Sequence, residues 1–310
     1  MSLFSRRDFL RTISAAGIGI YASSLIGCKR NGAKIGVRVL RENELSDKLA
    51  VASGGEIEEM VRSTVKALGG MDKLVRKGDI VVLKPNIGWA QPPENGASTN
   101  PDVVATIVKL CIEAGAKKVK VFDNTLDDKR RAYSETGIGK AAQDAGADTP
   151  FIDDSRFVEL EIPDGKTLKK WLTYRDALEC DVLINVPVAK VHNSSSLTLA
   201  MKNLMGIVGG NRGLWHQDLH THIADFSTAV KCDLTIIDGY RVMVRNGPRG
   251  GRPDDVEVKK TIAVCKDIVA ADAFAAKELF GREPKDIGYI QQGHERGIGN
   301  MEYETRFLRL

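Results

Sequence analysis

Hydrophobic and polar positions divide most of the chain into two alternating kinds of segment. Short runs rich in Val, Ile and Leu are separated by longer segments whose apolar positions recur at helical spacing. Because the cores of the short runs are continuously apolar, we expect a sheet that is covered on both faces. The pattern therefore predicts an α/β fold with a mainly parallel, doubly wound sheet covered by helices. The predicted strands are 34–40, 79–86, 117–124, 181–188, 233–239 and 260–266.

The segments between these strands predict helices and one small hairpin. In the segment 99–117, Asn100 can cap a helix, and Pro101 suits its first turn. The residues 156–171 alternate around a P-D-G turn and predict a hairpin insertion. We see no linker that would divide the chain after residue 28, so 29–310 is predicted to form one domain. Further helices are expected at 56–70, 217–229 and 272–281.

The first 28 residues follow a different pattern. SRRDFLRT (5–12) places two arginines before a weakly apolar run that is too short and too rich in Gly and Ser to span a membrane. This resembles a twin-arginine export signal. It ends in LIGC, which resembles a lipobox with Cys28 as the lipidated residue. An amphipathic N-terminal helix and cleavage without lipidation are the alternatives.

From this signal we expect the chain to use the twin-arginine translocation machinery. The protein would then be periplasmic or on the cell surface, and anchored to the membrane by lipid if Cys28 is modified. The compartment is one in which disulfides can form. Cys111, Cys180, Cys232 and Cys265 are either disulfide partners or small buried hydrophobic residues.

Composition narrows the possible functions. The formal net charge of +4 and the aromatic content of 6% argue against a nucleic-acid-binding surface. The cysteines form no C-x-x-C pair, so the sequence indicates neither a zinc ribbon nor an iron–sulfur cluster. Whether another metal ion serves as a cofactor stays open at this stage.

Polar residues follow four of the predicted strands directly. In open α/β sheets, ligands bind in the crevice outside the carboxyl ends of the strands. If the four strands are parallel, their terminal side chains converge on one rim of the sheet. These side chains are Lys84 and Asn86, Asp123 and Asn124, Asn185, Lys190 and His192, and Asp238.

The rim has features that suit an anion. Lys84, Lys190 and Lys202 supply positive charge near the strand ends. The glycine-rich loops 206–213 and 245–253 carry arginines and can present backbone N–H groups to an oxyanion. Neither loop matches a P-loop or a dinucleotide-binding turn, and surface loops without a binding role are the alternative. The prediction is a small anionic ligand.

Three histidines lie close together between Trp215 and Asp225. On a helix over 217–229, His216 and His220 lie on one side and His222 on the other, which disfavours a three-histidine zinc site. Three interpretations remain. His216 and His220 bind a metal with Asp238 or Asp123; one histidine at the rim acts as an acid or base; or all three are ordinary helix residues.

No motif for a nucleophilic serine is present. The serines at 194–196 follow His192, and their simpler interpretation is that they cap a helix running through Met201.

Several short motifs, in a fixed order, resemble the bacterial and archaeal domain of unknown function 362 family. They are VVLKPNIG, TNPDVV, KVFDN, INVPVAKVH, LTLAMKNLMGIV, IADF, LTIIDG, NGP and AADAF. The resemblance extends from about Lys34 to Gly299. The positions that match the family are Lys84, Asn86, Thr99, Asn100, Asn185, Lys190, His192, Lys202, Asn203, His216, Asp225, Asp238, Asn246 and Asp272.

The resemblance implies no particular activity. Some family members are joined to ferredoxin-like cysteine clusters and are described as iron–sulfur proteins, but this chain lacks those cysteines. Our first hypothesis is an exported, membrane-anchored enzyme or enzyme-like protein that uses a small anionic ligand, which Lys84, Lys190 and Lys202 would hold. Asn86 and Asn185 would orient the ligand, and His192 or His216 would transfer protons. The alternative is a non-catalytic binding or accessory protein for a periplasmic redox system.

Overall fold

The computed structural model describes residues 36–38 and 40–309 of the chain. The predicted twin-arginine signal and Cys28 lie outside the described residues. No helix within the described part is both long and apolar enough to cross a membrane. The cysteines at 111, 180, 232 and 265 are free thiols, and all but Cys180 are buried.

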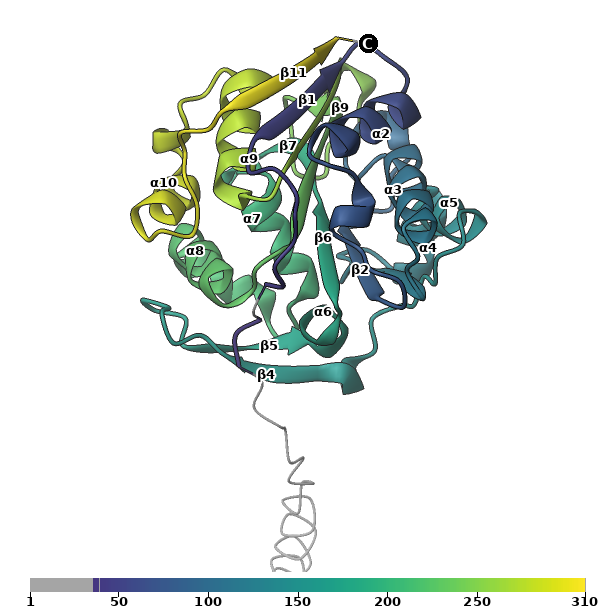
Figure 1. Cartoon of the computed structure of the whole chain (residues 1–310). Helices are drawn as coiled ribbons and strands as arrows, with labels where there is room; N and C mark the ends of the chain where they lie inside the picture. The colour runs from purple at the N-terminus through teal and green to yellow at the C-terminus, as the bar shows by residue number, and fades with distance from the viewer. Residues whose placement is uncertain (1–35, 39, 310) are drawn as a thin grey trace, which may run out of the picture. The chain divides into compact units, whose positions relative to one another are not determined.

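A mixed sheet, nine-stranded within the described residues, forms the centre of the fold. Its main path has the order β11-β1-β10-β9-β6-β2-β3, and β7 and β8 extend it beside β9 (Figure 1). The strands are β1 (Leu49–Ser53), β2 (Ile80–Pro85), β3 (Lys118–Val121), β6 (Val182–Val186), β7 (Val188–His192), β8 (Ser196–Thr198), β9 (Leu234–Met243), β10 (Val256–Cys265) and β11 (Thr305–Arg309).

The four strands that were expected to form a rim are adjacent and parallel. β2 pairs in parallel with β3 and with β6, and β6 pairs in parallel with β9. The register places Lys84 opposite Asn185, one residue before β2 and β6 end. The predicted α/β fold with a mostly parallel sheet is therefore confirmed. The predicted strand 260–266 belongs to β10, which runs antiparallel to both β9 and β1.

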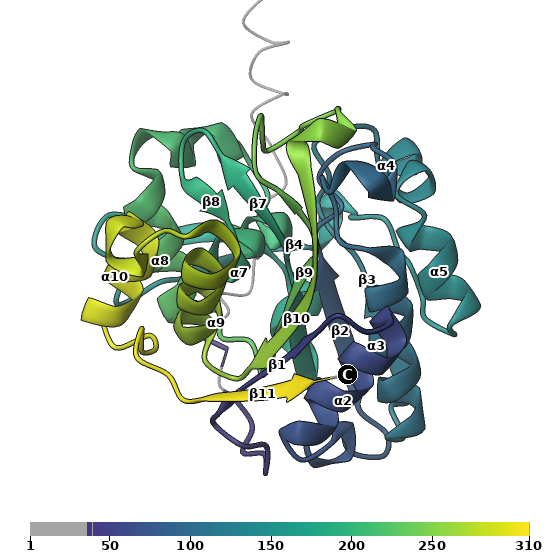
Figure 2. The same cartoon turned by 90° about the horizontal axis from the view of Figure 1, so that it is seen from above.

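Helices cover both faces of the sheet (Figures 1 and 2). Alternate strand residues point to opposite faces, so Val82 joins one apolar core while Val81 and Leu83 join the other. The core around Val81 also contains residues of α2 (Ile57–Ala67), α3 (Pro101–Glu113), α4 (Lys129–Glu135) and α5 (Ile138–Asp144). The core around Val82 contains residues of α6 (Arg175–Glu179), α7 (Ala200–Asn203), α8 (Leu219–Ala229), α9 (Ile268–Phe274) and α10 (Gly288–Glu295).

The predicted hairpin insertion is present as a separate two-stranded sheet. β4 (Phe157–Glu161) pairs antiparallel with β5 (Lys170–Tyr174). The buried carboxylate of Asp225 on α8 accepts hydrogen bonds from the backbone N–H groups of Lys166, Thr167 and Leu168 at the tip of the hairpin. Asp225, which matches the family pattern, therefore holds the hairpin against the helical layer.

Several boundary predictions were wrong. The described residues of 34–40 form no strand; Arg38 instead donates its backbone N–H to Ala229 O and buries its side chain. The helix expected from Asp272 begins at Ile268, because Asp267 caps it through the N–H groups of Val269 and Ala270. The serines at 194–196 form a turn and the start of β8 rather than a helix cap.

Candidate functional site

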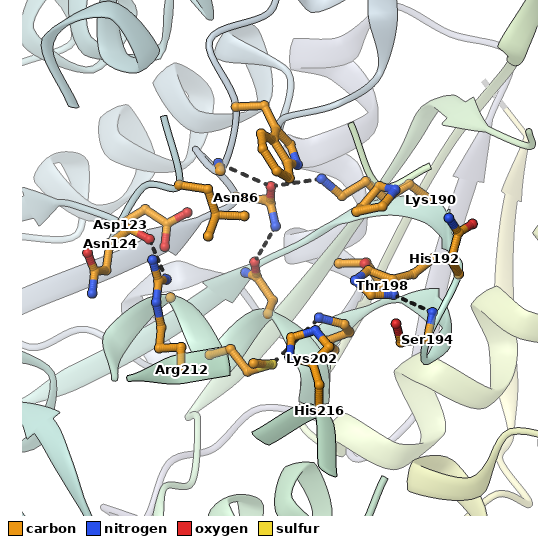
Figure 3. Close-up of a pocket in the computed structure, with 18 of the residues that line it drawn as sticks. Asn86, Asp123, Asn124, Lys190, His192, Ser194, Thr198, Lys202, Arg212 and His216 are labelled. Atoms are coloured by element: carbon orange, nitrogen blue, oxygen red, sulfur yellow. Dashed lines mark hydrogen bonds between the residues drawn. The ribbon is translucent and has the colours of Figure 1, made fainter. Parts of the chain in front are cut away.

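A cavity of about 430 Å³ lies at the carboxyl ends of the parallel strands. Its wall combines the ends of β2, β3 and β7 with α7 and the short 3-10 helix η5 (Arg212–Gln217), as Figure 3 shows. Among the described residues, the wall carries four Lys or Arg side chains and a single carboxylate, so it is electropositive. We call it the rim pocket. Its charged side chains are Lys84, Asp123, Lys190, Lys202 and Arg212.

The deepest charges in the rim pocket form an ion pair. Lys84 Nζ lies 2.9 Å from Asp123 Oδ1, and both side chains are almost fully buried. Lys84 also donates to Pro85 O and to Asn203 Oδ1, at 3.2 Å for the latter. The backbone N–H of Ile87 donates to Asp123 Oδ2 at 2.6 Å. Burial lowers the pKa of Lys84, and the charge of Asp123 opposes that effect.

Only glycine fits beside this ion pair at position 206. A Cβ atom on Gly206 would lie 1.8 Å from Asp123 Oδ1 and 2.3 Å from Lys84 Cε. The backbone of η4 (Leu204–Ile207) can therefore pass directly against the pair. This contact explains the glycine in the loop GIVGGNRG that the sequence marked as a candidate anion cradle.

Three asparagines join the strand ends into one hydrogen-bonded network. Asn86 donates to Asn203 Oδ1 at 3.0 Å and accepts from Lys190 Nζ at 3.1 Å. Asn203 donates to Asn185 Oδ1 at 2.8 Å and to Lys84 O at 3.1 Å. The amides thus fix the positions of both lysines, although Asn185 itself does not line the pocket.

Lys190 and Lys202 differ in how their amines are held. Lys190 donates to Ala97 O as well as to Asn86, so protein oxygens occupy it. Lys202 is 9% exposed, and the partner found for its amine is the thioether of Met205, at 3.5 Å. A thioether is a weak acceptor. The amine of Lys202 is therefore the buried donor most available to a ligand.

Burial, with a smaller effect of neighbouring cations, depresses the pKa values of both amines. Burial lowers the pKa of Lys190 to about 7, and the charges of Lys202 and Lys84 act in the same direction. Burial and the nearby Arg212 lower the pKa of Lys202 to about 8. Both amines can consequently exchange protons near neutral pH, which is a property of groups that act as acids or bases.

His192 is held as a neutral hydrogen-bond donor. Its Nδ1 accepts from the backbone N–H groups of Ser194 and Ser195 at 3.1 and 3.3 Å, so the proton of the neutral ring lies on Nε2. Burial, with the charges of Lys202 and Lys190, lowers the pKa of His192 to about 3. The exposed residue His216 belongs to η5, and its ring stacks on that of His192 with 6.3 Å between the ring centroids.

The histidines predicted to bind a metal do not come together. His220 accepts from the backbone N–H of Tyr289 at 3.1 Å and stacks on its ring, away from the rim pocket. His222 contacts Trp215 O through Nδ1 at 3.1 Å. Across the described residues, no three His, Cys, Asp or Glu side chains are grouped so that they could hold a metal ion. His216, His220 and Asp238, which were predicted together as metal ligands, are therefore not grouped in the described part of the structure.

Asp238 and its neighbours support the pocket from behind. Asp238 Oδ2 accepts from the backbone N–H of Asn100 at 2.7 Å, and burial raises the pKa of this carboxyl to about 6. Asn100 also caps α3, as the sequence predicted. Thr99 Oγ1 accepts from the backbone N–H of Asn86 at 2.8 Å. None of these three side chains lines the pocket. Their hydrogen bonds hold neighbouring segments of the pocket wall in position, which gives a structural reason for their match to the family pattern.

Asn246 lies in the loop between β9 and β10. Its side chain donates to Asp255 Oδ1 at 2.7 Å and does not line the rim pocket. Its neighbour Pro248 does line it. The structure thus brings together seven of the residues predicted for the site, whose roles in binding or catalysis stay predictions: Lys84, Asn86, Lys190, His192, Lys202, Asn203 and His216.

Two kinds of residue that line the pocket, an arginine and a set of apolar side chains, received too little weight in the prediction from the sequence. Arg212 enters from η5 and is held by Asn124 O at 2.7 Å and Thr125 O at 3.0 Å. Its place in a glycine-rich loop was the signal that pointed to it. The apolar part of the wall had no such signal, because single apolar residues in loops form no period. That part consists of Trp89, Leu126, Met205 and Pro248.

Comparisons with known proteins agree with the family resemblance. A family model described as a domain of unknown function (DUF362) matches residues 81–277. A thylakoid-associated protein of Synechocystis sp. is 27% identical over 263 residues, which is 82% of this chain and 79% of the relative.

Two solved structures show a weaker likeness. The lactate racemase apoprotein from Thermoanaerobacterium thermosaccharolyticum has a TM-score of 0.40 at 15% identity, over 66% of this chain and 52% of that one. A protein from Thermotoga maritima has a TM-score of 0.33 at 10% identity, over 64% and 52%. This chain spans about half the length of both, and we base no argument on either.

Proposed function

The chain belongs to the DUF362 family, and we propose that it is an exported enzyme that binds a small anionic ligand in the rim pocket. The observation that carries the proposal is the buried amine of Lys202, which faces the pocket without a protein oxygen as partner. A buried cation without such a partner is costly, and a bound anion removes that cost.

The pocket also supports acid–base chemistry on the bound ligand. Lys190 and Lys202, with pKa values of about 7 and 8, can take up or release a proton near neutral pH. Neutral His192 presents its Nε2–H and can stabilise negative charge that develops on a ligand oxygen. The lysines rather than His192 are therefore our candidates for proton transfer.

Binding can be tested by thermal shift with acetate, succinate, glycerol 3-phosphate and inorganic phosphate. We expect at least one of these anions to raise the melting temperature of the wild-type protein, and Lys202→Met to abolish that rise. The matched control is Lys140→Met, because Lys140 is exposed on α5 and pairs only with Asp144 nearby. If no anion raises the melting temperature, or if the anions raise it in both variants as much as in wild type, the rim pocket is not an anion site.

Export and lipidation form a separate part of the proposal. They are supported by the arginine pair at 6–7 and by the LIGC motif that ends at Cys28. The Synechocystis relative is named for its association with thylakoids, which are membranes. Mass spectrometry of protein isolated from a membrane fraction is expected to find an acylated N-terminal Cys28. Replacing both arginines by lysine should retain the precursor in the cytoplasm; an unchanged mature product would refute the twin-arginine route.

A further inference from the structure

Resting on the proposed function, we propose that the ligand of the rim pocket is a multiply charged anion, with a phosphate monoester or several carboxylates, that Lys190, Lys202 and Arg212 hold together. The proposal goes beyond anion binding because it fixes the minimum charge of the ligand at two. It follows from a count of the charges in the wall, from their arrangement and from the apolar surface beside them.

The charges of the pocket do not balance. Of the described residues in the wall, Asp123 alone is negative, and it forms its ion pair with Lys84. Lys190, Lys202 and Arg212 are then left without carboxylates of their own. Since separated buried charges are costly, a ligand with one negative charge would leave two cations uncompensated. A ligand with two or three negative charges would neutralise the site.

The arrangement of these cations favours one ligand rather than several separate ions. Lys202 lies close enough to both others for their charges to affect one another: Arg212 lowers the pKa of Lys202, and Lys202 lowers that of Lys190. Figure 3 shows Lys202 between the side of the pocket with Arg212 and the side with His192. A group with several anionic oxygens can contact all three cations at once.

The remaining wall indicates that the anion has an organic part. Trp89, Leu126, Met205 and Pro248 line the same cavity of about 430 Å³. This volume falls within the range of pockets that enclose small organic molecules and exceeds the needs of a single inorganic ion. Arg249 lies over the Trp89 ring at 5.4 Å and forms an ion pair with Asp127 at 3.8 Å.

Binding of such a ligand should be coupled to proton uptake. The groups that face Lys190 and Lys202 across the pocket are Lys84, Asp123, His192, Arg212 and His216. A multiply charged anion among them would raise the depressed pKa of Lys190 from about 7 towards its usual value. At about pH 8.5 the free amine is mostly neutral and the bound amine mostly protonated, so binding takes up a proton. At about pH 6 both are protonated and uptake vanishes.

Isothermal titration calorimetry of the purified protein tests this with five probes. They are acetate, succinate, tricarballylate, glycerol 3-phosphate and inorganic phosphate, each in two buffers of different ionisation enthalpy at both pH values. We expect the multiply charged probes to bind at least about tenfold more tightly than acetate, and Lys202→Met to weaken them on the order of 30-fold. The two buffers should reveal proton uptake at about pH 8.5 that is absent at about pH 6. Glycerol 3-phosphate and tricarballylate separate a phosphate site from a carboxylate site.

The outcomes separate this inference from the proposed function. If acetate binds as tightly as the multiply charged probes and its binding still requires Lys202, the inferred charge of the ligand is wrong, while the rim pocket remains an anion site. If no probe binds, or if Lys202→Met and the control Lys140→Met bind the probes like wild type, both the proposed function and this inference are wrong. Tight binding of succinate or glycerol 3-phosphate without proton uptake at either pH would also overturn the inference, because Lys190 would then not face the anion.

Discussion

The two ends of the parallel strands hold buried charge in opposite ways. At the amino ends, Arg38 lies 2.7 Å from Asp233, directly before β9, and Arg41 lies 2.5 Å from Asp79, directly before β2. Each cation there has its own carboxylate. At the carboxyl ends, the pocket wall carries four cationic side chains, and Asp123, which pairs with Lys84, is the one carboxylate among its described residues. The first arrangement is balanced within the protein, whereas we propose that a bound anion balances the second.

Hydrogen bonding shows the same difference. Asp233 Oδ2 also accepts from the backbone N–H of Leu183 at 2.8 Å, and Arg38 also donates to Lys231 O at 2.8 Å. Among the described residues, the partner of the Lys202 amine is the Met205 sulfur. A buried ion pair with further hydrogen bonds stabilises a fold, whereas a buried cation with so weak a partner reduces stability. Removing a charge should therefore have opposite effects on stability at the two ends.

The largest effect is expected at the amino ends. Asp233→Ala leaves Arg38 buried without a counter-charge and should lower the free energy of unfolding by about 3–5 kcal/mol. Anion binding in the rim pocket should be unchanged in the fraction that stays folded. Urea unfolding measures the loss. The control is Glu304→Gln, because the Glu304 side chain is 77% exposed in its pair with Lys48 and such pairs contribute about 1 kcal/mol or less. Equal losses in both variants would contradict the structural role of the Arg38 pair.

The second prediction concerns the ion pair between Lys84 and Asp123 at the carboxyl ends. Gly206→Ala would place a Cβ atom 1.8 Å from Asp123 Oδ1, and the backbone or the ion pair must move. We expect a loss of about 1–3 kcal/mol in unfolding free energy together with weaker anion binding. Gly36→Ala serves as the control, since nothing lies within 4 Å of its added Cβ. Unchanged binding in Gly206→Ala would show that the Lys84–Asp123 pair does not shape the site.

The third prediction is a gain in stability rather than a loss. Lys202→Met replaces a buried cation by an apolar side chain of similar length, so it should raise the free energy of unfolding by about 1 kcal/mol or more. The melting temperature should rise by about 2–4 °C in a solution without added anions. Differential scanning calorimetry against wild type measures the change. A less stable variant would mean that Lys202 is held by the protein itself, and the contrast between the two ends would then fail.

The sequence predicted the rim well because parallel strands bring their terminal residues together whatever the loops do. Lys84, Lys190 and His192 could be placed in this way, before any contact was known. The strands β1, β7, β8 and β11 were missed. The apolar run of β1 is only four residues long and half of it is alanine, which is depleted in strands, and β11 is a partly exposed edge strand with two arginines. Neither β1 nor β11 shows the run of Val, Ile and Leu by which the other strands were found.

Tertiary partners could not be predicted from spacing. His216 and His220 lie four apart, yet η5 ends at Gln217 and α8 starts at Leu219, so the two histidines are not on one helix. Asp238 was predicted at the end of a strand, but it lies within β9, and its oxygens accept from the backbone of Asn100 and Tyr240. Which polar strand end faces the pocket depends on such contacts between distant segments.

The smallest effect is the pH dependence of stability that Lys190 causes. The pKa of this amine is about 7 in the folded protein and near its usual value of about 10.4 in the unfolded chain. Between these values this amine binds more protons in the unfolded chain than in the folded protein, so it adds to the free energy of unfolding a rise of about 1 kcal/mol per pH unit. The carboxyls of Asp238 and Asp272, with pKa values raised by burial to about 6 and 8, have largely lost their protons by about pH 9.

Between about pH 9 and about pH 10 the cysteine thiols, whose pKa values are raised by burial, contribute with the opposite sign, so the effect of Lys190 is measured as a difference from wild type. Urea unfolding at both pH values should give a change in unfolding free energy that is less positive for Lys190→Met than for wild type, whereas the exposed-site variant Lys140→Met should match wild type. The comparison depends on the slope rather than on the absolute stability, so the hydrogen bonds that Lys190 makes to Asn86 and Ala97 do not obscure it. An unchanged slope in Lys190→Met would mean that this amine keeps its proton in the folded protein. The pocket would then already hold enough negative charge, contrary to the difference between the two strand ends.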